Sequence, residues 1–250
     1  MTPLNAILLF LAGIAAGFVN VSAGGGSFLT IPLLMILGGL PAAAANGTNR
    51  VAVLVQNLVA IRNFRRHGFR DIRQGIKLGI SAMAGAVIGS FIALDIPGNV
   101  FRTVLSVIMV LALVTVLRPG RKNTQKDNPG NLRHPVLQII TFFFIGIYGG
   151  FIQAGTGYLI IFSLSVIGGL SLIKTNSLKI VIIATYLTPS LIIFIANGEV
   201  KWFPALILTA GTSLGGWFGS TFAIKKGDKW IRVILAVAIL GMAAKMAGLF

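Results

Sequence analysis

The sequence predicts an all-α integral membrane protein, with about ten helical segments arranged in two inverted repeats of five. Three features predict this fold: the composition, the spacing of the apolar segments and the distribution of positive charge. Of the 250 residues, 56% are hydrophobic and only 10% are charged. Soluble domains contain about 45–50% apolar residues with glycine included, and about 25% charged residues. A soluble fold cannot bury this much apolar surface, so the chain is expected to lie in a lipid bilayer.

The first half of the chain, residues 1–117, contains five apolar segments and is the first predicted repeat. A helix needs about 20 residues to cross a hydrocarbon core of about 30 Å. The segments are residues 4–21, 27–40, 42–61, 76–94 and 100–117. The second segment is short and directly follows the glycine-rich break Ala23-Gly24-Gly25-Gly26. Whether this short segment spans the membrane or re-enters it stays open.

Residues 118–135 are rich in polar residues, proline and glycine, and they are predicted to form a cytoplasmic linker. The second predicted repeat, residues 136–250, contains segments 136–153, 158–173, 176–196, 202–224 and 230–249. Its second segment is again short and follows a glycine-rich break, Ala154-Gly155-Thr156-Gly157. In the fourth segment of each half, glycines spaced four residues apart are typical of closely packed helices. These glycines are Gly85 and Gly89 in the first half, and Gly211, Gly215 and Gly219 in the second.

The two halves are also related by sequence. A shift of 130 residues aligns Gly85 with Gly215 and Asn46 with Asn176, and shifts of 131 to 133 align the two glycine-rich breaks. The identities are few, but they recur in the same order over most of each half. This pattern predicts an internal repeat, with a chance match as the alternative.

Positive charge predicts the orientation of the chain. Lys and Arg number six in residues 62–77, five in residues 118–133, two at Lys174 and Lys179, and four in residues 225–232. The opposite side has three, at Arg102, Lys201 and Lys245. By the positive-inside rule the richer side is cytoplasmic, so both termini are expected outside. Five segments per half make the halves antiparallel, which is the plan of many secondary transporters.

The same residues argue against several functions. The net charge of +16 lies in loops, where it sets topology, so no nucleic-acid partner is expected. The chain has no cysteine, and its two histidines lie in basic loops, so no metal or cofactor is expected. All five acidic residues lie in loops or at segment ends, which argues against a proton relay or a metal-cation permease. No catalytic set lies at membrane depth, so the protein is not expected to be an enzyme.

The two breaks are the predicted substrate site. Irregular backbone at membrane depth is tolerated only inside protein or around a cavity, and the start of a helix attracts anions. Two such starts brought together could hold one small anion. The predicted binding residues are Asn20, Gly24, Gly25, Gly26, Ser27, Asn49, Arg50, Gln153, Gly155, Thr156, Gly157 and Tyr158. The alternative is that the glycines only allow tight helical hairpins.

Two basic residues within the apolar segments have different expected roles. Arg50 lies about eight residues into its segment, roughly 12 Å deep at the helical rise, with no carboxylate near it in the sequence. We expect its partner to be the substrate, with a structural bond to backbone carbonyls at a break as the alternative. Lys179 lies about one turn from the cytoplasmic end and is expected to snorkel to the membrane surface. The Thr156 hydroxyl is expected to add a donor to the anion site.

A family resemblance rests on these same motifs. Residues 13–32 and 46–50, with Ala23-Gly24-Gly25-Gly26-Ser27 among them, resemble the first half of the sulfite exporter TauE/SafE family, also called the toluene sulfonate uptake permeases. Residues 146–157 and 174–179 resemble its second half. The resemblance implies transport of a sulfur oxyanion or an organosulfonate, of the sulfite, sulfonate or thiosulfate class, across the bacterial plasma membrane.

The expected mechanism is alternating access by a secondary transporter, with export favoured. A membrane potential of 100 mV, negative inside, favours exit of a monovalent anion by about 2.3 kcal/mol, so export needs no coupling ion. The alternatives are a passive anion channel on the same scaffold and a non-transporting membrane subunit. The exact anion, the direction, any coupling ion and the choice between monomer and homo-oligomer stay open.

Overall fold

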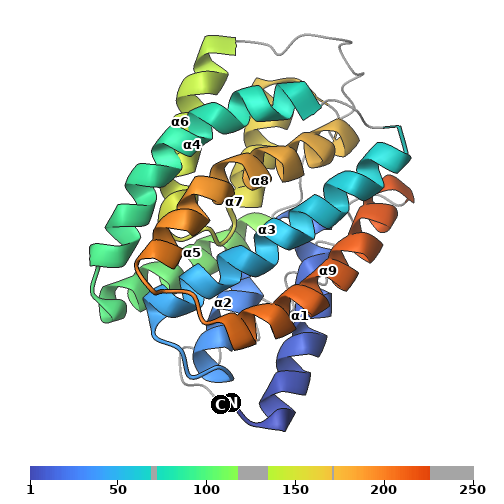
Figure 1. Ribbon diagram of the computed structural model, residues 1–250. Helices are drawn as coiled ribbons and strands as arrows, with labels where there is room; N and C mark the ends of the chain where they lie inside the picture. The colour runs from blue at the N-terminus through green and yellow to red at the C-terminus, as the bar shows by residue number, and fades with distance from the viewer. Residues whose placement is uncertain (69–71, 118–134, 171, 226–250) are drawn as a thin grey trace.

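The computed structural model describes residues 1–68, 72–117, 135–170 and 172–225, and this part of the chain is helical without any strand (Figure 1). The first half forms α1 (Pro3–Ala23), α2 (Ser27–Ile36), α3 (Ala42–Arg66), α4 (Ile72–Asp95) and α5 (Gly98–Leu117). The second half forms α6 (Pro135–Phe151), α7 (Thr156–Phe162), the π-helical turn η1 (Ser163–Ile167), α8 (Leu172–Ala196) and α9 (Trp202–Lys225). The all-helical prediction is therefore confirmed. Residues 118–134 of the predicted linker and the predicted tenth segment, residues 230–249, lie outside the described residues, and Pro135 begins α6.

Three of the described helices are long and apolar enough to cross a membrane. These spans are Pro3–Ser22, Ile72–Asp95 and Lys174–Ala196. Large apolar side chains also lie exposed on the surface, among them Leu4 on α1, Phe144 on α6 and Phe203 on α9, each more than half exposed. Extended apolar surface of this kind is costly in water and favourable in lipid. The fold is thus that of an integral membrane protein.

The second helix of each half is short, as the sequence predicts. The α2 helix has 10 residues, about 15 Å at the helical rise, and it ends at Ile36 and not at residue 40. It stops there because Gly39 adopts a left-handed conformation, with φ of 64°, before Pro41 begins the next helix. The α7 helix has 7 residues and continues as η1. By length, neither α2 nor α7 with its π-helical turn can cross a bilayer.

Glycines allow α4 and α6 to touch through their backbones. A Cβ atom on Gly85 would collide with the carbonyl oxygen of Phe143, and one on Gly89 with that of Ile147. Only glycine permits this approach, so the predicted close packing of α4 is confirmed.

The α9 helix packs against α1 in the same manner. A Cβ atom on Gly211 would collide with the carbonyl oxygen of Phe10, and one on Gly215 with that of Ile14. The predicted packing role of these glycines is confirmed. In both helix pairs the glycines and the carbonyls that they face are four residues apart, so each seam runs along a single helix face.

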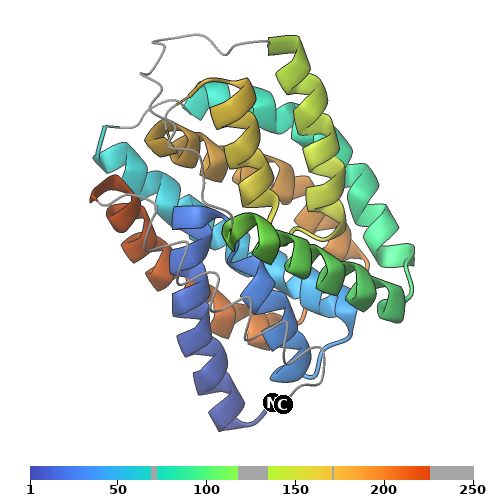
Figure 2. The same cartoon turned by 180° about the vertical axis from the view of Figure 1, so that it is seen from behind.

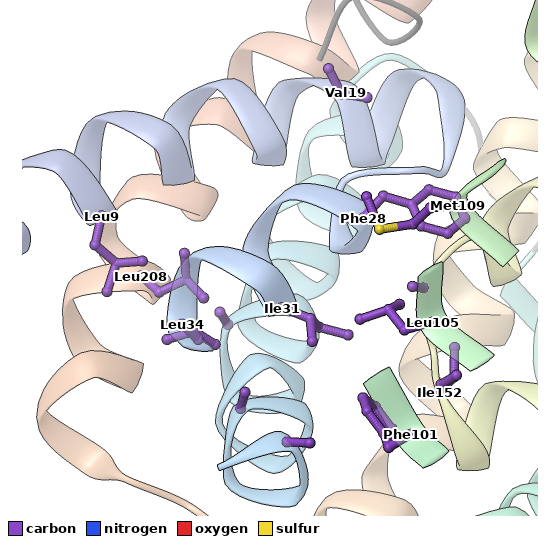
Figure 3. Packing of buried hydrophobic residues seen from close by; sticks show 14 residues of the cluster. Leu9, Val19, Phe28, Ile31, Leu34, Phe101, Leu105, Met109, Ile152 and Leu208 are labelled. Carbon is purple, nitrogen blue, oxygen red and sulfur yellow. The ribbon is translucent and has the colours of Figure 1, made fainter. Parts of the chain in front are cut away.

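The two seams lie far apart in the molecule. Figures 1 and 2 place α1 and α6 at opposite ends of it, with α3 and α8 between them. A buried apolar cluster then packs the first half against the second break. Figure 3 shows Phe28 and Ile31 of α2 facing Leu105 and Met109 of α5, with Ile152, just before the second break, close by. This cluster fixes the start of α2 beside the end of α6.

Candidate functional site

The two glycine-rich breaks are in direct backbone contact. The first break begins at Gly24, which caps α1 in a left-handed conformation with φ of 91°. The second contains Gly155, with φ of 76°, just before α7. A Cβ atom on Gly24 would lie 2.7 Å from the Cα and carbonyl carbon of Gly157. The structure therefore brings together two segments that are more than 130 residues apart.

One side chain of α3 joins both breaks. The Asn49 amide donates from Nδ2 to Ser27 Oγ at 3.2 Å and to Gln153 Oε1 at 3.4 Å. Its oxygen accepts a hydrogen bond from Thr30 Oγ1 at 2.5 Å. All four side chains are buried. Asn49 is thus the polar centre of the place where the two breaks meet at Gly24 and Gly157, which we name the crossing.

Gln153 has an unused donor at this centre. It is the one non-glycine residue in the described part of the chain with a positive φ, 63°, and only 4% of its surface is exposed. Its amide nitrogen Nε2 has no hydrogen-bond partner among the described residues. A buried polar group without a partner is rare, so this donor is available to a ligand. The Thr156 hydroxyl, expected to be a free donor, instead donates to the Gln153 carbonyl oxygen at 2.7 Å.

Arg50 is fully buried and binds the end of α6. Its acceptors are Gly149 O at 3.3 Å, Gly150 O at 2.5 Å, Ser190 Oγ at 2.7 Å and Asn46 Oδ1 at 3.4 Å. Its guanidinium also lies 4.3 Å from the centre of the Phe194 ring. These contacts match the structural alternative, a bond to backbone carbonyls at a break. The Nε atom of Arg50 has no hydrogen-bond partner among the described residues.

Lys179 is fully buried, so the prediction that it snorkels is wrong. Its ammonium donates to the carbonyl oxygens of Asn20 at 3.1 Å and Val21 at 2.8 Å, and to Asn176 Oδ1 at 2.9 Å. Asn176 in turn donates to the Ser22 carbonyl oxygen at 3.0 Å. The lysine stays inside because the last turn of α1 supplies the acceptors that the membrane surface would otherwise offer.

The remaining predicted residues also lie at the crossing. Asn20, Gly25 and Gly26 are buried, and a Cβ atom on Gly26 would lie 2.5 Å from Asn20 Cβ. Tyr158 lies just past the contact, with its backbone nitrogen 3.1 Å from a Cβ atom built on Gly24. Neither α2 nor α7 has a side-chain cap at its start. The positive ends of these helices are therefore not neutralised by a side chain of their own N-cap residue.

Sequence reasoning missed several residues of this site. They are Thr30, Asn46, Asn176, Lys179 and Ser190. One signal was available for three of them, Asn46, Asn176 and Lys179: an asparagine is followed about one turn later by a cation at both Asn46-Arg50 and Asn176-Lys179. Asn46 also donates to the Phe151 carbonyl oxygen at 2.8 Å, as Asn176 does to that of Ser22.

Acidic groups are absent from the crossing as far as the structure describes the chain. The two acidic residues in the described ranges, Asp95 and Glu199, are not buried and lie at the end of α4 and between α8 and α9. The crossing thus combines two buried cations, several amide donors and two helix starts. This chemistry suits an anion better than a cation.

Known proteins resemble this chain along its whole length. The family model described as sulfite exporter TauE/SafE matches residues 9–246. The probable membrane transporter protein ORF9 of Sinorhizobium sp. is 27% identical over 239 residues, which cover 95% of this chain and 90% of that protein. A probable membrane transporter protein of Haemophilus influenzae is 28% identical, covering 96% and 93%. The probable membrane transporter protein YfcA of Escherichia coli K12 is 28% identical, covering 98% and 91%. No solved structure matches the chain significantly.

Proposed function

Because the chain belongs to the sulfite exporter TauE/SafE family of membrane transporters, we propose that it exports a small sulfur-containing anion across the bacterial plasma membrane. The protein is a transporter and not an enzyme. The substrate class is sulfite, a sulfonate or thiosulfate. The observation that carries the proposal is the crossing itself, where Gly24 meets Gly157 and Asn49 binds Ser27 and Gln153, which flank the two breaks.

The proposal includes two inverted repeats, and the matching helix seams support them. A shift of 133 residues takes Phe10 and Ile14 of α1 to Phe143 and Ile147 of α6. A shift of 126 takes Gly85 and Gly89 of α4 to Gly211 and Gly215 of α9, which face the equivalent carbonyls. This register differs by one helical turn from the sequence alignment at 130.

The anion is proposed to lie at the crossing, against the start of α2. One donor is Nε2 of Gln153, which has no hydrogen-bond partner among the described residues. The other is Nδ2 of Asn49, which would exchange its 3.4 Å bond to Gln153 for one to the anion. Arg50 supplies positive charge, with its Nε available to the ligand. The backbone nitrogens of the glycine-rich breaks complete the site, because glycine lets a ligand approach the chain closely.

In the proposed cycle the helix pair of one seam, α1 with α9, rocks against the pair of the other, α4 with α6, around this fixed site and exposes it to one side at a time. The contacts across the crossing keep the breaks together while the outer helices move. Export of a monovalent anion is driven by the membrane potential alone, at about 2.3 kcal/mol per 100 mV. Uptake would need a co-transported cation.

The test is anion flux in proteoliposomes with an imposed potential. Sulfite flux is compared with that of sulfate, thiosulfate and an organosulfonate, without Na⁺ or a pH gradient. We expect saturable, potential-driven movement of one sulfur oxyanion with counterflow. Flux that does not saturate, without counterflow, would instead identify a passive channel, and no flux of any anion would favour a non-transporting subunit.

A matched pair of variants tests the site. Asn49→Asp keeps the shape of the side chain but replaces an amide donor with a negative charge, so we expect flux to be lost. Asn197→Asp places the same charge at an exposed position after α8 and is expected to transport normally. Equal flux in the two variants would place the anion away from Asn49.

A further inference from the structure

We propose that Lys179 is a positioning residue that sets how strongly the site binds an anion, and that its effect grows with the charge of that anion. The inference rests on the proposed function, because it concerns the same site. Lys179 belongs to α8 of the second half, yet two backbone carbonyls that accept from it lie in the last turn of α1, in the first half.

The arrangement around Lys179 mirrors that around Arg50. Arg50 of α3 binds the carbonyls of Gly149 and Gly150, in the last turn of α6, and Asn46 binds the next one. Lys179 of α8 binds two carbonyls in the last turn of α1, and Asn176 binds the next one. Each half therefore supplies an asparagine and a cation, and these two side chains bind the end of the helix that leads into the break of the other half.

The physical reason for a cation at these points is the helix dipole. The C-terminal end of a helix carries a partial negative charge, about half an elementary charge on its unpaired carbonyls. The α1 helix ends at Ala23, and only three residues separate it from Ser27, where α2 begins and the anion is proposed to bind. Without a cation, the carbonyls of α1 would repel the anion that the start of α2 attracts.

Lys179 also holds one of the predicted binding residues, Asn20, in place. One of its acceptors is the backbone oxygen of Asn20, and the Asn20 side chain lies against Gly26. Its hydrogen bonds therefore hold the last turn of α1 against α8, and its charge offsets the negative end of that helix. The two roles can be separated, because the hydrogen bonds act equally on all anions whereas the Coulomb energy is proportional to the charge of the anion.

A series of substitutions at Lys179 separates the role of its hydrogen bonds from the role of its charge. Lys179→Arg keeps the charge and the donors, Lys179→Gln keeps a donor without the charge, and Lys179→Met removes both. The control is Lys77→Met, at an exposed position on α4. The probes are thiosulfate, divalent at neutral pH, and methanesulfonate, which is monovalent. Affinity is measured in detergent from the rise in unfolding temperature with anion concentration, and in proteoliposomes from inhibition of sulfite flux.

We expect Lys179→Gln to weaken methanesulfonate binding on the order of tenfold and thiosulfate binding about a hundredfold, since the Coulomb loss for the divalent anion is the square of that for the monovalent one. Lys179→Met should add a further loss that is the same for both anions, because it also removes the hydrogen bonds. Lys179→Arg should restore both affinities, and Lys77→Met should match the wild-type protein. If Lys179→Met does not fold, Lys179→Gln against Lys179→Arg gives the same comparison.

Two negative results have different meanings. Equal losses for the two anions, or no loss, in a protein whose wild-type form binds both would overturn the electrostatic role of Lys179 alone. A wild-type protein that neither binds nor moves any of these anions would contradict the proposed function, and the inference with it.

Discussion

Arg50 shows how a charged residue is accommodated at the centre of a membrane protein. Burying an ionised group in an apolar environment is costly unless it is hydrogen-bonded. Two carbonyls at the end of α6, a serine and an asparagine supply the acceptors for Arg50, and the Phe194 ring covers its face. The guanidinium thus stabilises the fold as well as the proposed anion site.

Arg50→Ala is expected to abolish flux and also to lower the unfolding temperature. The substitution leaves the buried oxygens of Gly149, Gly150 and Ser190 without this donor, at about 1–3 kcal/mol for each unsatisfied group. For a chain of this size, each kcal/mol shifts the unfolding temperature by roughly 2–4 °C. Unfolding in detergent measures the shift, with Arg50→Lys expected to fall between Ala and wild type. An unchanged unfolding temperature would contradict the structural role.

The partners of Arg50 and Lys179 explain why the site was only partly predicted. The glycines, the polar residues of α3 and the positions of the breaks are visible in the sequence because they interrupt apolar segments. The acceptors of Arg50 in α6 and α8, and those of Lys179 in α1, lie between 99 and 159 residues away. No local pattern shows such contacts, so the sequence suggested snorkelling for a lysine that the structure buries.

At the scale of single elements, the glycine-rich breaks act through contact more than through flexibility. Gly24 combines a left-handed backbone with a neighbour, Gly157, that leaves no room for a side chain. Gly39 has the same type of backbone, with φ of 64°, but no atom lies within 4 Å of its Cβ position. Comparing substitutions at these two glycines therefore distinguishes the effect of a left-handed backbone from the effect of close contact between the breaks.

Gly24→Ala is expected to abolish flux and to destabilise the protein by several kcal/mol more than Gly39→Ala. Both variants carry the same left-handed strain, of order 1–2 kcal/mol, but only Gly24→Ala also forces the two breaks apart. Thermal unfolding and sulfite flux of the two purified variants provide the comparison. Similar losses in both would mean that the contact with Gly157 contributes little.

Helix ends were predicted within a few residues where an apolar segment is followed directly by polar or charged residues. The ends of α4 and α9 differ from the predicted ends by only one residue. The end of the seventh segment was predicted at residue 173, but the α-helix ends at Phe162 and continues as a π-helical turn. Composition did not indicate this change, because it accompanies the reciprocal hydrogen bonds between Gln138 and Ser163, which lie on different helices.

At the scale of the whole molecule, the proposed inverted arrangement predicts on which side of the membrane each half begins. The start of α1 and the start of α6 are equivalent positions in the two proposed halves, and they must face opposite sides of the membrane. Thr2 and Val136 are both exposed. The chain contains no cysteine, so a single introduced cysteine can be labelled without background.

A membrane-impermeant thiol reagent is expected to label Thr2→Cys in intact spheroplasts and Val136→Cys only after the membrane is opened. The positive-inside rule supplies the direction, because the second position follows a strongly basic segment. Labelling after solubilisation shows that both cysteines are reactive. Labelling of both positions from the same side would rule out inverted repeats.

Side chains of α3 bind the end of α6, and side chains of α8 bind the end of α1. This exchange between the two halves also has a consequence for biosynthesis. The carbonyls at the end of α6 can meet Asn46 and Arg50 as soon as α6 enters the membrane, because those residues are already made. The carbonyls at the end of α1 must wait for Asn176 and Lys179, which lie 154 to 159 residues later in the chain. At about 5–20 residues per second, that delay is roughly 8–30 s. A ribosome that stalls before α8 therefore leaves a first half in which the last turn of α1 lacks the donors that Asn176 and Lys179 supply.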